Sequence, residues 1–454
     1  MSKKFSKEPL RGMRDYYPSD LREFNWIIDT LRDVAERYGY EEYETPQIEP
    51  IEIFAAKSSQ ELVNEQSFIV EKKKGEKLIL IPELTPSLAR MVAKKSQELK
   101  KPIRWFCIPT CFRYERPQRG RLREFKQPNF DILGEESLYG ELEIFNIIVD
   151  IFTEFGASPE QFKIYYNSRR LVDSILNNIL KLSEEKIPLV YKVLDKSDKM
   201  EEEEYEKFII DSFQNEVDIQ NILKLKDANS VDELLKRFDT IPEKFYESKG
   251  YLEFNKFEKL IMESGISDYC SFSSSTVRGL DYYTGIIYEV FDTGTENKRS
   301  IFGGGRYDDL ISLFSDEKIT GTGFGMGVYT LYLFLETYNL IPKDIQEKDY
   351  SDTIYIASIN EEVSMYAIKL ARIIREEDFP CIIDYRFKNL KNQLKKASEL
   401  GVMIALIIGP DEMEKNRVTV KNMLTEEQNT ILIDDLIDEI YRIIDEFEES
   451  EPDR

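Results

Sequence analysis

The chain has 454 residues and a formal net charge of −24 at pH 7, from 62 basic and 86 acidic side chains, and it contains no histidine. This length exceeds the roughly 300 residues at which single cores stop growing, so we expect two or three domains. The lack of histidine excludes Ser-His and Cys-His hydrolases, and chemistry must use carboxylates, arginines, tyrosines or the substrate itself. The acidic balance argues against indiscriminate nucleic-acid binding, so any such binding must be local.

Membrane insertion and disulfide bonding are not indicated by the sequence. No apolar run approaches the roughly 18 residues of a membrane span, and the opening MSKKFSKEPLRG has no apolar signal segment. Four scattered cysteines, Cys107, Cys111, Cys270 and Cys381, predict free and mostly buried thiols in a cytoplasmic protein.

The first third of the chain predicts helices and short strands. Apolar residues recur at helical spacing over residues 21–38, and Gly39 is a fitting end for that helix. A short apolar strand over residues 77–82 precedes a helix that runs to about Lys94, which places Glu83 at a strand end.

Two strands, residues 104–115 and 125–134, read as an antiparallel pair, and residues 285–292 alternate like another strand. This pattern predicts a mostly antiparallel sheet flanked by helices, an α+β fold. The loop of the pair gathers five arginines, Arg113, Arg116, Arg119, Arg121 and Arg123, whose planar groups suit phosphate oxygens. A solvated sheet edge, charged to prevent aggregation, is the alternative interpretation.

The rest of the chain changes character twice. Residues 170–268 are rich in Leu, Lys and Glu, which indicates an inserted helical segment. After a linker near Pro342, apolar strands alternate with helical segments, which is typical of a small α/β domain.

Two further segments combine glycines, arginine and aromatics: VRGLDYYTG at 277–285, and GGGRYDDL with GTGFGMG at 303–327. Together with FRYERPQRGRLREFKQPNFDILG at 112–134, they resemble the signature blocks of class II aminoacyl-tRNA synthetases of the histidyl type. RGMRDYYPSD at 11–20 resembles the opening of that family, and YGYEEYETPQIEP at 38–50 resembles its first motif. Residues 394–423 resemble its anticodon-binding domain.

The resemblance implies a class II catalytic domain in two parts, 1–169 and 269–342, a helical insertion at 170–268, and an anticodon-binding α/β domain at 350–445. It implies that ATP activates L-histidine for transfer to the 3′ end of tRNA(His), with Mg²⁺ accompanying ATP and its ligands unknown. A homodimer is expected, because Leu21 to Pro46 resembles the motif that builds dimer interfaces. A non-catalytic regulatory subunit of histidine biosynthesis, or a synthetase for proline, threonine or glycine, are the alternatives.

Site residues follow from the matched motifs. Arg113 and Arg278 are implied as catalytic residues that bracket the reacting carboxylate and α-phosphate. The ATP site would contain Arg113, Glu115, Arg121, Phe125 and Arg306. The histidine pocket would contain Glu83, Thr85, Gln127, Asp131, Arg278, Tyr282 and Tyr283. The tRNA would meet Arg116, Gln118, Arg119 and Arg123.

Several of these positions leave alternatives open. Arg278 is also placed to form a salt bridge with Asp281, and Tyr282 to serve in the core. Asp131 stands where the family pattern suggests glutamate, so it would reach an imidazole through a water or a shifted strand. The segment GMGVYTLYL at 325–333 lacks, after Gly327, the arginine that usually holds the γ-phosphate. Either Arg121 and Arg306 with Mg²⁺ compensate, or ATP use is impaired.

Overall fold

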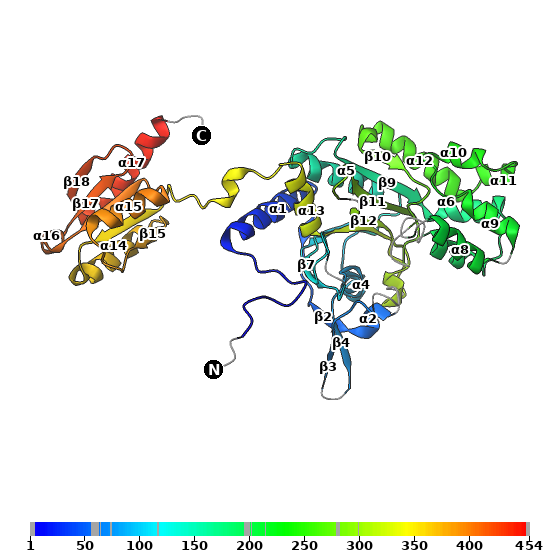
Figure 1. The fold of residues 1–454 in the computed structure, drawn as a ribbon, viewed down its shortest axis with the longest axis horizontal. Coiled ribbons are helices and arrows are strands. Elements are labelled where there is room, and N and C mark those ends of the chain that lie inside the picture. Colours follow the sequence, from blue (N-terminus) through cyan, green and yellow to red (C-terminus); the bar gives the residue numbers. More distant parts are fainter. Residues whose placement is uncertain are drawn as a thin grey trace. The chain divides into compact units, whose positions relative to one another are not determined.

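The computed structural model describes residues 5–55, 63, 65–72, 75–115, 118–194, 200, 202–213, 215–277, 282–297 and 299–450. The chain forms two compact units, Met1–Gln346 and Glu347–Arg454 (Figure 1). Within the described ranges, no helix is long and apolar enough to cross a membrane. The four cysteines are free, as expected, and Cys107, Cys111 and Cys381 are buried.

An eight-stranded sheet organises the first unit, in the order β1-β5-β8-β13-β12-β11-β9-β10. The outer pairs β1-β5 and β9-β10 are parallel and the inner pairs are antiparallel, which confirms the predicted sheet. Its strands are β1 Glu41–Glu42, β5 Ile103–Cys107, β8 Asn129–Leu133, β9 Phe162–Ser168, β10 Cys270–Phe272, β11 Ile286–Asp292, β12 Ser300–Arg306 and β13 Gly321–Met326.

The two strands expected over 104–115 and 125–134 are each divided in two. β5 and β8 pair in the large sheet, whereas β6 (Thr110–Phe112) and β7 (Glu124–Lys126) form a separate two-stranded sheet. Pro109 and Pro128 stand at the two divisions, and a proline has no N–H to continue a ladder. The arginine-rich loop therefore belongs to a small hairpin of its own.

Three helices cover one face of the large sheet: α1 (Pro18–Arg37), α5 (Tyr139–Glu154) and α13 (Val328–Thr337). The predicted first helix is confirmed, although it begins three residues earlier, at Pro18. Its apolar positions Phe24, Ile27, Leu31 and Val34 are buried in one core with side chains of α5 and α13. Gly39 follows with a φ of +73°, a left-handed conformation that suits glycine.

Between β9 and β10, the described residues form helices joined by turns and loops, without a strand. Its helices are α6 Arg169–Ser174, a π-helical turn Ile175–Ile179, α7 Ile187–Leu194, α8 Glu202–Ser212, α9 Glu216–Leu223, α10 Val231–Lys236, α11 Glu243–Tyr246 and α12 Lys249–Glu263. Phe254 and Phe257 of α12 pack against Tyr166 of the sheet, within the same core. The helical segment is thus continuous with the sheet domain in its packing.

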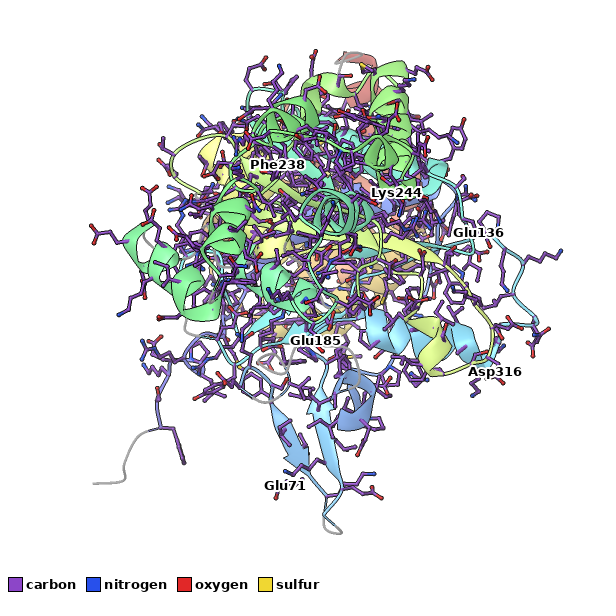
Figure 2. All side chains as sticks on the ribbon, turned by 90° about the vertical axis from the view of Figure 1, so that its right-hand side faces the viewer. Glu71, Glu136, Glu185, Phe238, Lys244 and Asp316 are labelled. Atoms are coloured by element: carbon purple, nitrogen blue, oxygen red, sulfur yellow. The ribbon has the colours of Figure 1, made fainter. Side chains whose placement is uncertain are left out.

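A three-stranded sheet, in the order β2-β4-β3, and short helices complete the first unit. These elements are β2 Ile48–Pro50, β3 Ile69–Glu71, β4 Lys77–Leu80, α2 Ile51–Ala55 and α4 Thr85–Lys94. Figure 2 shows Glu71 at the end of β3, on a hairpin that projects from the neighbouring elements.

The second unit has the expected α/β composition. Its sheet has the order β15-β14-β16-β17-β18, with β14, β15 and β16 parallel to one another. The elements are β14 Ile354–Ser358, α14 Ser364–Glu376, β15 Cys381–Ile383, α15 Leu390–Leu400, β16 Ile404–Ile408, α16 Pro410–Glu414, β17 Arg417–Asn422, β18 Gln428–Leu432 and α17 Leu436–Ser450. The β-strands and helices enclose a core separate from that of the first unit.

A buried ion pair joins the large sheet to α5. The Arg306 and Glu141 side chains are 3% and 0% exposed, and their groups meet through Nε–Oε1 and through Nη2–Oε2 at 2.6 Å. The remaining donors of Arg306 reach the carbonyls of Glu135 and Ser137 and the carboxylate of Asp308. All five N–H groups of this arginine are therefore used inside the protein.

Removing one partner of this pair should destabilise the first unit. Glu141→Ala leaves a buried guanidinium without its main counter-charge, so the free energy of unfolding should fall by about 3–5 kcal/mol. Urea unfolding followed by tryptophan fluorescence measures this, because Trp26 and Trp105, the two tryptophans of the chain, both lie in the first unit. Glu154→Ala, which breaks an exposed pair with Arg37, is the matched control. An equal loss in both variants would contradict the assignment.

Candidate active site

A cavity of about 360 Å³ lies on the face of the large sheet opposite to the helices. Along β8, Phe130 and Ile132 enter the core, whereas Asn129 and Asp131 line the cavity, as the alternation of a strand requires. The structure brings together ten of the predicted site residues here: Glu83, Thr85, Arg113, Glu115, Arg121, Phe125, Gln127, Asp131, Tyr282 and Tyr283.

Glycines of β12 and β13 form part of the cavity floor. A Cβ on Gly323 would collide with the Asp131 carboxyl and with the Phe130 carbonyl oxygen. A Cβ on Gly304 would lie 2.5 Å from the Tyr288 hydroxyl. These glycines therefore keep room for the polar groups of the neighbouring strands.

Arg113 lies just past β6, with its guanidinium fixed in the cavity wall. Its Nε donates to the Pro82 carbonyl at 2.9 Å and its Nη2 to Gln127 Oε1 at 3.4 Å, while its Cζ lies 5.3 Å from the Phe125 ring centre. Arg121 Nη1 donates to Glu115 Oε2 at 2.5 Å. Both arginines are thus oriented before any substrate binds.

The cavity wall also carries a buried carboxylate and a tyrosine. Glu83, between β4 and α4, is 2% exposed, and its Oε2 accepts a hydrogen bond of 2.9 Å from the Tyr282 hydroxyl. Burial, together with the charge of Glu83, raises the pKa of Tyr282 well above its usual value, so the phenol stays protonated and remains a donor. Tyr282 both packs in an apolar cluster and lines the cavity, so both readings of its role hold.

Asp131 is the most unusual group of the site. It is 1% exposed, its Oδ1 accepts a hydrogen bond of 2.5 Å from the Tyr307 hydroxyl, and its Oδ2 has no hydrogen-bond partner among the described residues. Burial raises the pKa of this carboxyl to about 7, although the Tyr307 hydrogen bond opposes the shift. The wall of the cavity thus contains a buried carboxyl oxygen without a hydrogen-bond partner among the described residues.

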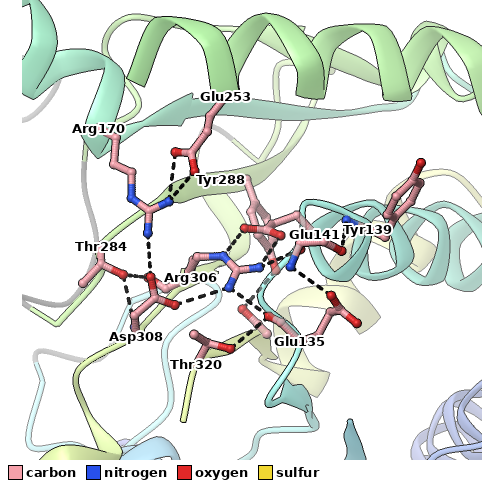
Figure 3. Close-up of polar contacts among 12 residues, drawn as sticks. Glu135, Tyr139, Glu141, Arg170, Glu253, Thr284, Tyr288, Arg306, Asp308 and Thr320 are labelled. Atoms are coloured by element: carbon pink, nitrogen blue, oxygen red, sulfur yellow. Dashed lines mark hydrogen bonds and ion pairs between the residues drawn. The ribbon is translucent and has the colours of Figure 1, made fainter. Parts of the chain in front are cut away.

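Arg306 is not part of the cavity, which corrects the expectation that it binds ATP. Its side chain leaves β12 on the helix side and is engaged by Glu141 (Figure 3). Sequence motifs cannot show which face of a strand an arginine occupies. The neighbouring Tyr307, which sequence reasoning missed, is the residue that turns toward the cavity.

The remaining predicted residues lie elsewhere. Arg278, Asp281 and Arg116 are outside the described residues. Gln118 and Arg119 belong to the tip of the β6–β7 hairpin, where Arg119 Nη2 lies 3.7 Å from Glu296. Arg123 stacks over Tyr114 at 4.0 Å and donates to the carbonyls of Glu115 and Arg11. It therefore ties the N-terminal segment to the hairpin.

Sequence reasoning also missed Asn129 and Glu289, which line the cavity. Asn129 Oδ1 accepts a hydrogen bond of 3.1 Å from Gln127 Nε2 and so orients that amide. The alternation of β8 was the available signal, because Asn129 and Asp131 share a face. Glu289 gave no comparable signal, since an acidic residue in a predicted strand is usually assigned to a solvent-exposed face.

A second cavity of about 430 Å³ adjoins the first, and Tyr283 lines both. Three basic and three acidic side chains line it: Arg169, Arg170, Lys318, Asp173, Asp308 and Asp309. This balance favours no ligand charge, and most of these groups pair with one another or with nearby carboxylates.

Comparisons with known proteins agree with this architecture. The family model described as histidyl-tRNA synthetase matches residues 12–331, and the anticodon binding domain model matches residues 353–443. The chain is 37% identical to the histidine–tRNA ligase of Leptospira biflexa, covering 96% of this chain and 98% of that protein. It is 32% identical to the histidine–tRNA ligase of Haloarcula marismortui, covering 93% and 95% respectively.

Among solved structures, the histidyl-tRNA synthetase of Nostoc sp. PCC 7120 has the same fold, with a TM-score of 0.69, 24% identity, and coverage of 97% of this chain and 100% of that one. An antiparallel sheet with an arginine-lined cavity, followed by an anticodon-binding unit, defines a class II aminoacyl-tRNA synthetase. Within this class, the chain belongs to the histidyl-tRNA synthetase family.

The Asp131 carboxyl should titrate near pH 7, where a chain without histidine has few other titrating groups. Carbon-13 NMR of labelled aspartate, with Asp131→Asn as the subtraction control, measures this directly. Tyr307→Phe removes a hydrogen bond that stabilises the ionised form, so the midpoint should move to higher pH. A midpoint near 4 in the parental protein would contradict the burial argument.

Proposed function

We propose that the chain is a histidine–tRNA ligase, which activates L-histidine with ATP to histidyl-adenylate and transfers it to the 3′ end of tRNA(His). The observation that carries the proposal is the convergence of Arg113, Glu83 and Asp131 on one cavity. Family membership over most of the chain supports it. We propose the cytoplasm as its location, because translation consumes the product there.

The acidic side of the cavity suits histidine. Glu83 and Thr85 would hold the α-amino group, and Gln127, Asp131 and Tyr283 would surround the imidazole. The buried, unpaired Oδ2 of Asp131 supports this assignment, because an imidazole offers an N–H at the edge of its ring. A side chain without that polar edge would leave the buried carboxyl unpaired, which gives strong discrimination.

The basic side of the cavity suits ATP. The histidine carboxylate attacks the α-phosphate in line and pyrophosphate leaves, so catalysis is mainly alignment and stabilisation of spread negative charge. Arg113 would hold the α-phosphate, Glu115 and Phe125 would lie near the adenine, and Arg121 would reach the terminal phosphates. With Arg306 excluded, Arg121 remains the named cation for those phosphates.

We also propose that Mg²⁺ accompanies ATP. No group of three His, Cys, Asp or Glu side chains suited to a metal occurs among the described residues. Mg²⁺ commonly uses one or two carboxylates together with substrate phosphates and water. Glu289, a carboxylate of the cavity wall, fits that role. The metal would neutralise part of the phosphate charge.

The proposed tRNA contacts divide between the two units. Gln118 and Arg119 on the β6–β7 hairpin would meet the acceptor end, together with Arg116 and Arg123. The matched anticodon-binding domain would hold the other end of the tRNA. We retain the division into 1–169, 170–268, 269–342 and 350–445 as part of this proposal, with Arg278 completing the catalytic pair.

Arg113→Ala should slow histidine-dependent ATP–pyrophosphate exchange by a factor on the order of 10², the usual scale for lost charge stabilisation. Arg119→Ala is the matched control, because Arg119 lies on the same hairpin, is 55% exposed and does not line the cavity. It should leave exchange unchanged and slow the charging of tRNA. Parental exchange in Arg113→Ala would refute the assigned role.

A non-catalytic regulatory subunit is the remaining alternative, favoured by the missing third-motif arginine. The complete anticodon-binding match and the ligase relatives count against it. Charging of tRNA with histidine by the purified parental chain separates the two functions in one assay.

We further propose a homodimer. One face of the three-stranded sheet carries Ile48, Val70, Leu78 and Leu80, which the strand registers place side by side. Ile48 and Val70 are 39% and 41% exposed, which is high for an apolar sheet face in a single chain. Burial against a second copy would remove this surface from water.

Val70→Asp should weaken the dimer, because it places a charge in an apolar contact. Light scattering coupled to size-exclusion chromatography should give twice the chain mass for the parental protein and a lower mass for the variant. Val217→Asp, at a 65% exposed valine of α9, should leave the mass unchanged. A monomeric parental protein would overturn the proposal.

A further inference from the structure

A relay of ion pairs runs from the helical segment to the large sheet (Figure 3). Glu253 of α12 accepts from Arg170 Nη1 at 2.8 and 2.9 Å. Arg170 Nη2 donates to Asp308 Oδ2 at 2.7 Å, and Asp308 Oδ1 accepts from Arg306 Nη1 at 3.3 Å. Arg306 is fixed in turn by Glu141 of α5. Four elements of the fold thus meet at Asp308 and Arg306.

The relay holds the backbone on both sides of Tyr307. Arg306 and Asp308 are anchored on the face away from the first cavity, while Tyr307 between them points into it and bonds Asp131 at 2.5 Å. β12 ends at Arg306, but the Tyr307 N–H still donates to the Gly321 carbonyl at 2.7 Å, so the backbone stays beside β13 and two anchored neighbours restrict the direction of the side chain between them. The Tyr307–Asp131 hydrogen bond therefore depends on where Asp308 is held.

The same relay fixes the second tyrosine of the site. The backbone N–H of Asp308 donates to Thr284 Oγ1 at 3.1 Å, and the Thr284 N–H donates to the Arg306 carbonyl at 2.7 Å. Tyr283, directly before Thr284, lines both cavities. Two walls of the proposed imidazole pocket are therefore tied to the backbone at Asp308, whose carboxylate Arg170 holds from outside.

We propose that Arg170 is a positioning residue for histidine binding, and that the docking of α12 through Glu253 sets the geometry of the Tyr307–Asp131 and Tyr283 walls. This inference rests on the proposed ligase function. Arg170 does not line the first cavity, so it acts through Asp308. The helical segment thereby becomes a determinant of amino-acid affinity.

The test compares the KM values for the two substrates in pyrophosphate exchange. Arg170→Gln removes charge-assisted bonds worth about a tenfold change in an equilibrium constant, so the KM for histidine should rise about tenfold while the KM for ATP stays within about twofold. Arg170→Lys, which retains the charge but not the two-sided fork, should recover part of the affinity. Glu253→Gln removes the outer contact alone and should raise the histidine KM by about threefold.

A second readout follows the Asp131 titration by NMR and needs no activity. In Arg170→Gln a weakened Tyr307 hydrogen bond should move the midpoint to higher pH, in the direction expected of Tyr307→Phe. If Arg170→Gln does not fold, Glu253→Gln decides by both readouts.

Arg104→Gln is the matched control. Arg104 forms a comparable two-sided pair with Glu143, at 2.7 and 2.8 Å and with similar exposure, but neither residue lines the cavity. It should leave the histidine KM and the Asp131 titration unchanged. The inference would be overturned if Arg170→Gln kept the parental histidine KM and the parental Asp131 titration. It would also be overturned if the KM for histidine and the KM for ATP rose equally. Either result would leave the ligase function intact. A parental chain without histidine-dependent exchange would refute the proposed function. The Asp131 titration would still show whether Arg170 positions Tyr307.

Discussion

The buried pair between Arg306 and Glu141 is the contact on which the geometry of the cavity depends. It joins the end of β12 to the first turn of α5, on the helix side of the sheet. A buried arginine is tolerated here because every donor is satisfied, and the two carbonyls it bonds come from the turn before α5. The strand end is therefore rigid at the point where its next residue, Tyr307, enters the site.

The cavity combines arginines and carboxylates from different elements, which suits a reaction without proton transfer. Arg113 and Arg121 stand on the side of the β6–β7 hairpin, whereas Glu83 and Asp131 stand among the strands and the start of α4. The two substrates require opposite charges from the site. A triphosphate requires cations, whereas histidine offers an ammonium group and an imidazole, which suit carboxylates. Alignment between the two halves supplies most of what adenylation requires. The lack of histidine in the chain therefore removes nothing that this chemistry needs.

Much of the fold was predictable because it follows from local patterns. The helical spacing in α1 and the alternation in β11 gave the right elements, and the antiparallel sheet followed from them. The division of two strands into four was not foreseen, although Pro109 and Pro128 were visible. A proline interrupts a ladder only where its N–H would have been needed, and that depends on pairing across the sheet.

The sequence indicated which residues line the cavity better than it indicated the directions of their side chains. Ten expected residues share one cavity, because the motif order carries them to neighbouring strands. Arg306 was misassigned and Tyr307 was missed for the same reason. Tertiary packing decides which side chains of a strand face the core and which face the cavity. The glycines before Arg306 give no sign of which face of the strand is apolar, because they carry no side chain.

The raised pKa of Asp131 connects these points to selectivity. Burial raises the pKa of this carboxyl to about 7. This value is near the unperturbed pKa of an imidazole, about 6.5. In the proposed pocket, an imidazole N–H gives this buried carboxyl a hydrogen-bond partner, whereas an aromatic ring without nitrogen leaves Oδ2 unpaired. Under the proposed function, the aspartate, one methylene shorter than the glutamate that the family pattern suggests, would act from a buried position on β8.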